Sequence, residues 1–126
     1  MIKLNYISVE VAEAIKNILE DKVIPSENRV LVYSPGEDDT VLGNIIIPGT
    51  VKEGKPRKGV VILRGTLDED HVNYKPLTET GLIITYGLYA GKEVEFDDDL
   101  FKGIHITKGI FTVLDTTEII MAEANK

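Results

Sequence analysis

The stretch of residues 36–58 constrains the fold of this chain most, because it is long and rich in turn formers yet holds an apolar centre. It reads GEDDTVLGNIIIPGTVKEGKPRK, with glycines, prolines and charged side chains at both ends. Such ends have too little apolar surface to order themselves. Apolar strands are expected on either side, at residues 29–33 and 59–64. A compact domain rarely contains so long a connection unless the connection is functional or disordered. We call this stretch the arm.

The centre of the arm, residues 41–48, allows two interpretations. Ile45, Ile46 and Ile47 are consecutive and show no polar alternation. A short apolar run between turn signals is typical of a buried strand. In an exposed arm, the same run would be an apolar hook that needs a partner to bury it. The residues of the arm by themselves leave both interpretations open.

One helix is predicted, at residues 8–22, which read SVEVAEAIKNILEDK. Ser8 is a suitable N-cap, and Glu10 and Lys22 stand at the ends where they favour the helix dipole. The apolar residues recur at helical spacing and define one face: Val11, Ile15, Ile18 and Leu19. This face packs on the body of the protein, on a neighbouring subunit or on a partner, and the sequence does not choose among the three.

From residue 29 onward, short apolar segments alternate with turn formers. Strands are expected at residues 29–33, 59–64, 81–86, 92–96, 104–106, 111–114 and 118–122. Many short strands at near-regular spacing indicate an all-β barrel or sandwich. Residues 66–80 are polar and acidic and are expected to form a second exposed excursion. A chain of 126 residues is expected to be one domain with one modest core.

The residue types that catalysis and metal binding need are sparse. The chain has no cysteine, which excludes disulfides and thiolate metal sites. Its two histidines, His71 and His105, have no spaced partners that would complete a zinc site. The run at residues 97–99 lacks the ligand spacing of a calcium loop and is interpreted as a solvated turn. We therefore expect that the chain is not an enzyme and that it binds neither a metal ion nor a cofactor.

Charge and hydropathy exclude further classes of partner. The net charge of −7 argues against nucleic acid, because such binders need lysine and arginine to displace counterions. A local basic cluster is interpreted as a solvated flank of the arm: Lys52, Lys55, Arg57 and Lys58. No apolar run approaches the roughly 20 residues that span a bilayer, and the N-terminus does not resemble a signal peptide. A soluble cytoplasmic protein without a membrane partner is expected.

Five segments occur in an order that resembles a known family. They are residues 24–32 with an Arg-Val pair, the GNIIIP of residues 43–48, the KGVV of residues 58–61, the GLIITY of residues 81–86 and the closing residues 111–122. The chain resembles the GroES-type co-chaperonins, the small ring-forming lids of chaperonins, over residues 24–126. Three features depart from the family: Leu82 stands where Asp is usual, residues 1–22 have no counterpart in the common bacterial lid, and residues 92–109 are longer and more acidic. A divergent, viral lid that works on a host chaperonin would fit these additions.

The resemblance implies a domain organisation and a docking site. It implies a small GroES-like β-barrel at residues 23–126, a mobile loop at about residues 36–58, a roof-like excursion at about 66–80 and an added N-terminal helical extension at 1–22. The mobile-loop assignment favours the hook. Its anchors in an apolar groove of a GroEL-type chaperonin would be Ile45, Ile46 and Ile47, flanked by Gly43, Asn44 and Pro48.

The resemblance also implies a homo-oligomeric ring, a heptamer, in which the first strand of one subunit pairs with the last strand of its neighbour. The implied contact residues are Val23, Ile24, Arg29, Ile119, Ile120 and Met121. The implied roof residues, Asp68, Glu69 and Asp70, would repel one another near the ring axis and favour a wide orifice. ATP would bind the partner chaperonin, client proteins would be enclosed, and a viral lid would work in the host cytoplasm.

Two other classes remain as alternatives. One is a non-enzymatic β-barrel assembly module, or structural ring component, whose arm clamps a neighbouring subunit. The other is the lid-like domain of a zinc dehydrogenase, which the lack of cysteine and of a nucleotide-binding half disfavours.

Overall fold

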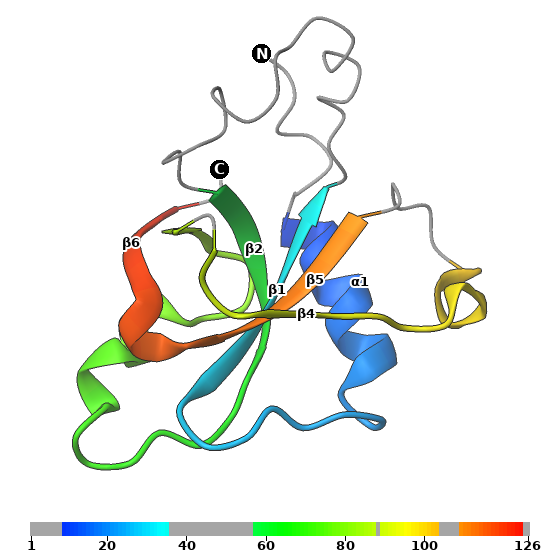
Figure 1. Ribbon diagram of the computed structural model, residues 1–126. Helices are drawn as coiled ribbons and strands as arrows, with labels where there is room; N and C mark the ends of the chain where they lie inside the picture. Colours follow the sequence, from blue (N-terminus) through cyan, green and yellow to red (C-terminus); the bar gives the residue numbers. More distant parts are fainter. Residues whose placement is uncertain (1–8, 36–56, 88, 104–108, 125–126) are drawn as a thin grey trace, which may run out of the picture.

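The computed structural model describes residues 9–35, 57–87, 89–103 and 109–124 (Figure 1). Its helix is α1 (Val9–Leu19), and its strands are β1 (Arg29–Pro35), β2 (Arg57–Arg64), β3 (Ile83–Tyr86), β4 (Lys92–Val94), β5 (Gly109–Asp115) and β6 (Ile119–Glu123). Three short 3₁₀ helices connect them: η2 (Val72–Leu77), η3 (Asp98–Phe101) and η4 (Thr116–Glu118). These strands pair antiparallel in one six-stranded sheet of order β4-β5-β1-β2-β3-β6. The expected all-β fold is confirmed.

One face of the sheet carries a core cluster whose buried residues all come from strands, with Leu77, Leu82 and Ala90 packed against it. The buried residues of this cluster come from β1, β2, β3, β5 and β6, and they are Val30, Val32, Val61, Ile84, Tyr86, Leu114 and Ile119. β5 and β6 lie near opposite ends of the sheet order, yet both contribute to this cluster because the sheet curves around it, as in a small barrel. A register shift between Leu31 and Val32, where β1 pairs with β2, increases the local bend.

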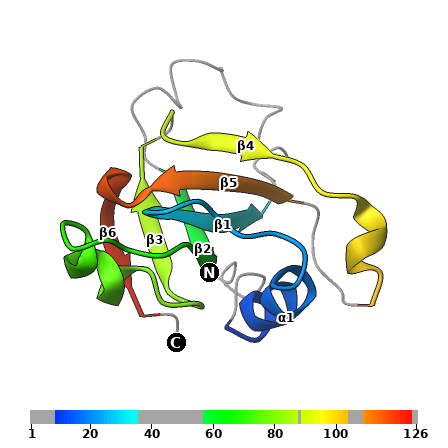
Figure 2. The ribbon, with the colours of Figure 1, turned by 90° about the horizontal axis from the view of Figure 1, so that it is seen from below.

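The other face of the sheet is covered by α1 and by the segment around η3 (Figure 2). Alternate residues of the same strands, such as Leu31 and Tyr33 of β1, point to this side because successive strand side chains face opposite ways. The three buried residues of α1, which are Ala12, Ile15 and Leu19, have no exposed surface and lie in this cluster. Of the three packing choices that the sequence left open, the structure shows that the helix packs on the body of the protein.

A group of aromatic side chains belongs to the same cluster as the buried face of α1. The rings of Phe101 and Phe111 are stacked with centroids 5.6 Å apart, and Phe96 meets Phe111 edge-on at 5.0 Å. Phe111 also contacts Tyr33 at 5.1 Å. The longer segment after β4 therefore supplies two phenylalanines that extend the core beside α1.

Several element boundaries differ from those expected. The helix ends at Leu19 rather than at residue 22, because the Leu19 carbonyl accepts hydrogen bonds from both Lys22 and Val23 and the last turn tightens. The strand expected at residues 81–86 begins at Ile83, after Gly81 at φ 98°. The excursion at residues 66–80 contains η2. The strand expected at 104–106 lies outside the described residues.

Candidate functional site

Both ends of the arm leave the sheet at the same end (Figure 1). Tyr33 of β1 pairs with Val60 of β2, and the Ser34 hydroxyl donates a hydrogen bond of 3.0 Å to the Lys58 carbonyl. The Lys58 ammonium in turn lies 2.7 Å from the Glu123 carboxylate of β6. Residues 57 and 58, which the sequence assigned to the arm, belong to β2. The predicted hook, Ile45 to Ile47 with its flanks Gly43, Asn44 and Pro48, lies outside the described residues.

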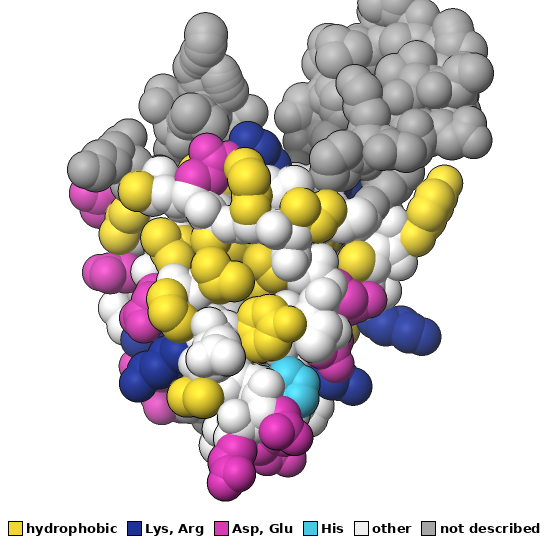
Figure 3. Space-filling model, turned by 90° about the vertical axis from the view of Figure 1, so that its left-hand side faces the viewer, with side chains coloured by type: hydrophobic (Ala, Val, Ile, Leu, Met, Phe, Trp, Pro, Cys, Tyr) yellow, Lys and Arg dark blue, Asp and Glu magenta, His cyan; other side chains and the backbone are white. Residues whose placement is uncertain are grey.

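The two edges of the described sheet differ in character. β4 is three residues long, and its Lys92 and Glu93 are exposed, a combination that protects an edge from pairing with other strands. β6 pairs only with β3 among the described strands and exposes Ile120 by 63% and Met121 by 49%. Figure 3 views the molecule from the side of β6 and shows apolar side chains gathered across that face. The β6 edge is therefore the one suited to contact another chain.

The segment that leads into β1 exposes a further large apolar side chain. Ile24 is 86% exposed, whereas Val23 is half-buried against the cluster around α1. The chain then turns, with the Arg29 amide donating to the Ser26 carbonyl at 3.0 Å, and β1 starts at Arg29. The part of the predicted contact strand before Arg29 is thus outside the sheet of its own chain.

The six predicted contact residues fall into two groups. Ile24, Ile120 and Met121 are exposed and available to a second chain. The other three have contacts within this chain: Val23 packs against the core, Ile119 is buried among the strand side chains, and Arg29 forms an ion pair.

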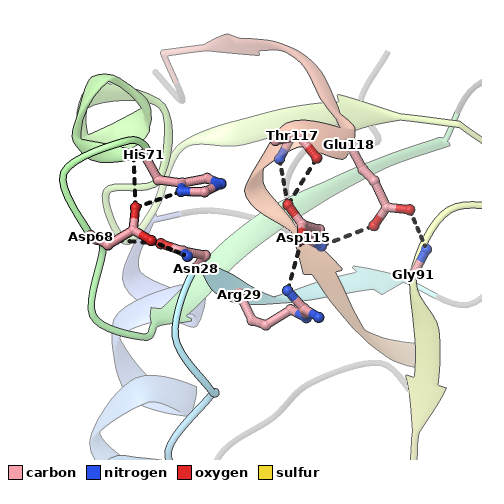
Figure 4. A network of polar contacts seen from close by, with 8 residues as sticks. All are labelled: Asn28, Arg29, Asp68, His71, Gly91, Asp115, Thr117 and Glu118. Carbon is pink, nitrogen blue, oxygen red and sulfur yellow. Dashed lines mark hydrogen bonds and ion pairs between the residues drawn. The ribbon is translucent and has the colours of Figure 1, made fainter.

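That ion pair belongs to a corner that orients β6 (Figure 4). The Arg29 guanidinium lies 2.7 Å from the Asp115 carboxylate, which also accepts hydrogen bonds from the Thr117 amide at 3.0 Å and the Thr117 hydroxyl at 2.8 Å. The pKa of Asp115 lies below its ordinary value, chiefly because the Thr117 amide donates to its carboxylate. The Thr117 hydroxyl and the Arg29 guanidinium lower this pKa further. Glu118 accepts from the Asp115 amide at 2.9 Å, completing a capping box around η4.

The predicted roof residues do not share one environment. Asp68 accepts hydrogen bonds from Asn28 and His71, whereas Glu69 and Asp70 are exposed (Figure 4). One of the three carboxylates is therefore held against the body of the protein, and two face solvent.

Sequence reasoning missed both polar clusters. The spacing of Asp115 and Glu118 is a capping-box signature and could have revealed the corner. Asn28 and Asp68 are 40 positions apart and carry no such local signal.

Metal binding and membrane insertion are two further functions that the described residues bear on. No group of three or more His, Cys, Asp or Glu in that part of the chain could hold a metal ion. None of its helices is long and apolar enough to cross a membrane.

The curved all-β domain, with a long connection between β1 and β2, defines a class of small β domains whose described sheet ends at an exposed apolar strand, β6. Within this class, the chain belongs to the family described as Chaperonin 10 Kd subunit, which it matches over residues 22–113. It is similar to the co-chaperonin GroES of Solidesulfovibrio magneticus, with 40% identity over 82 residues that are 64% of this chain and 84% of the relative. The co-chaperonins GroES of Parabacteroides distasonis and Thermotoga maritima are 38% and 36% identical, over 61% and 62% of this chain and 82% and 80% of their own lengths. The GroES-type resemblance and the co-chaperonin function are confirmed.

Proposed function

We propose that the chain forms a ring-shaped lid on a GroEL-type chaperonin and encloses client proteins while the chaperonin hydrolyses ATP. The family match over residues 22–113 carries this proposal, because it spans the sheet from before β1 into β5 and includes the arm. In this role the chain is not an enzyme, binds no cofactor of its own and works in the cytoplasm, which would be that of a host if the chain is viral.

The proposed contact with the chaperonin is the isoleucine triplet of the arm. Burying an isoleucine side chain contributes about 1.5–3 kcal/mol. Fixing the backbone of each arm residue opposes docking by about 1–2 kcal/mol. A single arm that becomes ordered on docking therefore binds weakly, and only a ring that presents several arms at once would bind firmly. Both ends of the arm leave the sheet at one end, and cyclic symmetry would place the bases of all arms at equivalent positions around a ring.

The proposed contact between subunits joins Ile24 of one chain to the β6 edge of the next, in a heptamer as the family resemblance implies. The exposure of Ile24, Ile120 and Met121 supports this pairing, because three large apolar side chains face solvent in the isolated chain. Pairing would also cover the β6 backbone groups that no other described strand pairs. The two exposed roof carboxylates, Glu69 and Asp70, would repel their copies around the axis and favour a wide orifice.

Replacing Ile46 by Glu tests the hook. We expect ATP-dependent co-sedimentation with a purified GroEL-type chaperonin to be lost, because a charged side chain cannot enter an apolar groove without a large desolvation penalty. Two controls are matched to this change: Ile46→Val keeps an apolar side chain, and Thr50→Glu adds the same charge elsewhere in the arm. Both should co-sediment as the native chain does.

The outcomes of this experiment are distinct. A folded Ile46→Glu variant that docks normally would remove the triplet from the mechanism. If the native chain forms rings but does not bind the chaperonin, the assembly-module function would replace the lid, and its arm would contact a neighbouring subunit instead.

A further inference from the structure

Two segments that are distant in sequence meet at Asp68 (Figure 4). One carboxylate oxygen lies 2.6 Å from His71 Nδ1 and accepts the Asp70 and His71 amides at 3.0 and 3.1 Å. The other oxygen accepts from Asn28 Nδ2 at 3.1 Å. Asp68 therefore closes the turn before η2 and joins that turn to the residue that precedes β1.

Asn28 connects this turn to two other parts of the chain. Its side-chain oxygen accepts from the Asp68 backbone amide at 3.1 Å, so the Asn28 side chain bonds both the backbone and the side chain of Asp68. Its own amide donates to the Thr66 carbonyl at 2.8 Å, and its carbonyl accepts from the Thr116 amide at 3.0 Å. Asn28 adopts φ 63°, a left-handed conformation that asparagine tolerates better than most residues. The excursion, the start of β1 and the corner before β6 are thus joined at one residue.

We propose that His71, Asp68 and Asn28 form a proton-sensitive latch: protonated His71 holds the turn of residues 68–71 most firmly through Asp68, and Asn28 ties that turn to the start of β1. This inference concerns the single chain and does not depend on the proposed docking to a chaperonin.

The proton that controls the latch is the one on Nε2. A carboxylate can only accept hydrogen bonds, so Nδ1 keeps its hydrogen in both charge states of His71 and Nε2 is the nitrogen that titrates. Raising the pH therefore preserves the hydrogen bond to Asp68 but removes the positive charge that strengthens it.

The charged surroundings of His71 favour its protonated form. Asp68 and Asp70 come from its own turn, and Asp115 comes from the corner before η4. Arg29, the cation beside Asp115, is paired with that carboxylate. Among the described residues, the ring of Tyr74 in η2 lies beside His71, with 6.0 Å between the centroids. The hydrogen bond to Asp68, opposed by partial desolvation, raises the pKa of His71 above its ordinary 6.5. The same bond, with that from Asn28, lowers the pKa of Asp68 below 3.8.

The two pKa shifts define a pH window for the latch. The contribution of His71 is fully present below pH 6.5, the ordinary pKa, and is lost as the pH rises through the raised value. The contribution of Asp68 is present above pH 3.8 and is lost as the pH falls through the lowered value. The latch is therefore tightest between these two ordinary values and weakens on either side.

The test combines a titration with hydrogen exchange on the full-length protein. The chain has two histidines, so comparison of the native protein with His71→Asn assigns the His71 ring signal by NMR. We expect that signal to titrate above 6.5 and to move toward 6.5 in Asp68→Asn. We also expect amide protection in residues 66–74, corrected for intrinsic rates, to fall as the pH rises from about 6 to about 9. The ratio of the His71 acid constants with the latch open and closed sets the upper limit of this fall.

Matched variants separate the latch from general stability. His71→Asn keeps a side-chain N–H donor without a titrating charge, so protection should persist and lose its pH dependence over this range. Asp70→Asn removes a neighbouring charge but no side-chain bond to His71, and should retain most of the pH dependence. Thermal melting confirms that each variant is folded. A native His71 that titrates at or below 6.5, or an unchanged pH dependence in His71→Asn, would overturn the proposal.

Discussion

At the scale of single residues, Gly65 controls the path of the segment that carries Ile24. A Cβ atom at Gly65 would lie 2.6 Å from the Pro25 carbonyl oxygen and closer still to that of Ser26. Both obstacles are backbone atoms, so neither can rotate away. We expect Gly65→Ala to lower the free energy of unfolding by about 1–3 kcal/mol, the usual range for overpacking, in urea titrations.

Gly87→Ala is the matched control, because a Cβ there meets nothing within 4 Å. It should leave stability unchanged to within about 0.5 kcal/mol. Equal stability of Gly65→Ala and the native chain would mean that the segment at residues 25–26 can move aside. In that case Ile24 would not be fixed in position by the fold.

Residues differ in how far the sequence reveals their surroundings. The sequence predicted a strand at residues 29–33, and Val30 and Val32 share one face of it because successive strand side chains point to opposite sides. The exposure of Ile24 was not predictable from its apolar character, because burial depends on where the turn at Ser26 directs the chain. The polar contact between Asn28 and Asp68 likewise depends on tertiary structure.

At the scale of elements, α1 shares a core with the sheet. The spacing of Val11, Ile15 and Leu19 predicted an amphipathic helix, and α1 confirms it. An apolar helix face must be covered, but the sequence pattern does not say which element covers it. The position of α1 over β2 could therefore not be predicted. The family match begins at residue 22, so this helix lies before the matched part of the chain.

Ile15→Ala tests whether α1 and the sheet unfold together. Ile15 is fully buried, and its truncation should lower the free energy of unfolding by about 2–5 kcal/mol. We expect far-ultraviolet circular dichroism and the fluorescence of buried Tyr33 and Tyr86 to report one coincident transition, shifted to lower urea. Glu13→Ala, on the exposed side of the same helix, should shift it little. A helix signal lost on its own, with the tyrosine transition unmoved, would make α1 an independent appendage.

At the scale of the whole molecule, the fold was more predictable than its assembly. Strand period and turn residues predicted the all-β class, and β1, β2, β3, β4, β5 and β6 appear where strands were expected. The strand order could not be read from the same pattern, because pairing of β1 with β5 joins residues 86 positions apart, as Arg29 and Asp115 show. Which edge is left open follows from that order, and so do the surfaces available to another chain.

Ile120→Lys tests the link between assembly and docking. Ile120 is 63% exposed, so a lysine there should leave the fold of the chain intact. In a ring, the same lysine would have to be buried against the neighbour's Ile24 segment, which is unfavourable for an unpaired charge. We expect native mass measurement to show single chains. Co-sedimentation with the chaperonin should also fail, although the isoleucine triplet is unchanged, because separate arms lose their shared effective concentration.

Tyr89→Lys is the matched control. It places the same charge at a side chain that is 85% exposed and outside the proposed contact, so the variant should still form the ring and dock. Rings of Ile120→Lys would exclude the β6 edge from the subunit contact, whereas single chains that dock at native affinity would show that one arm suffices.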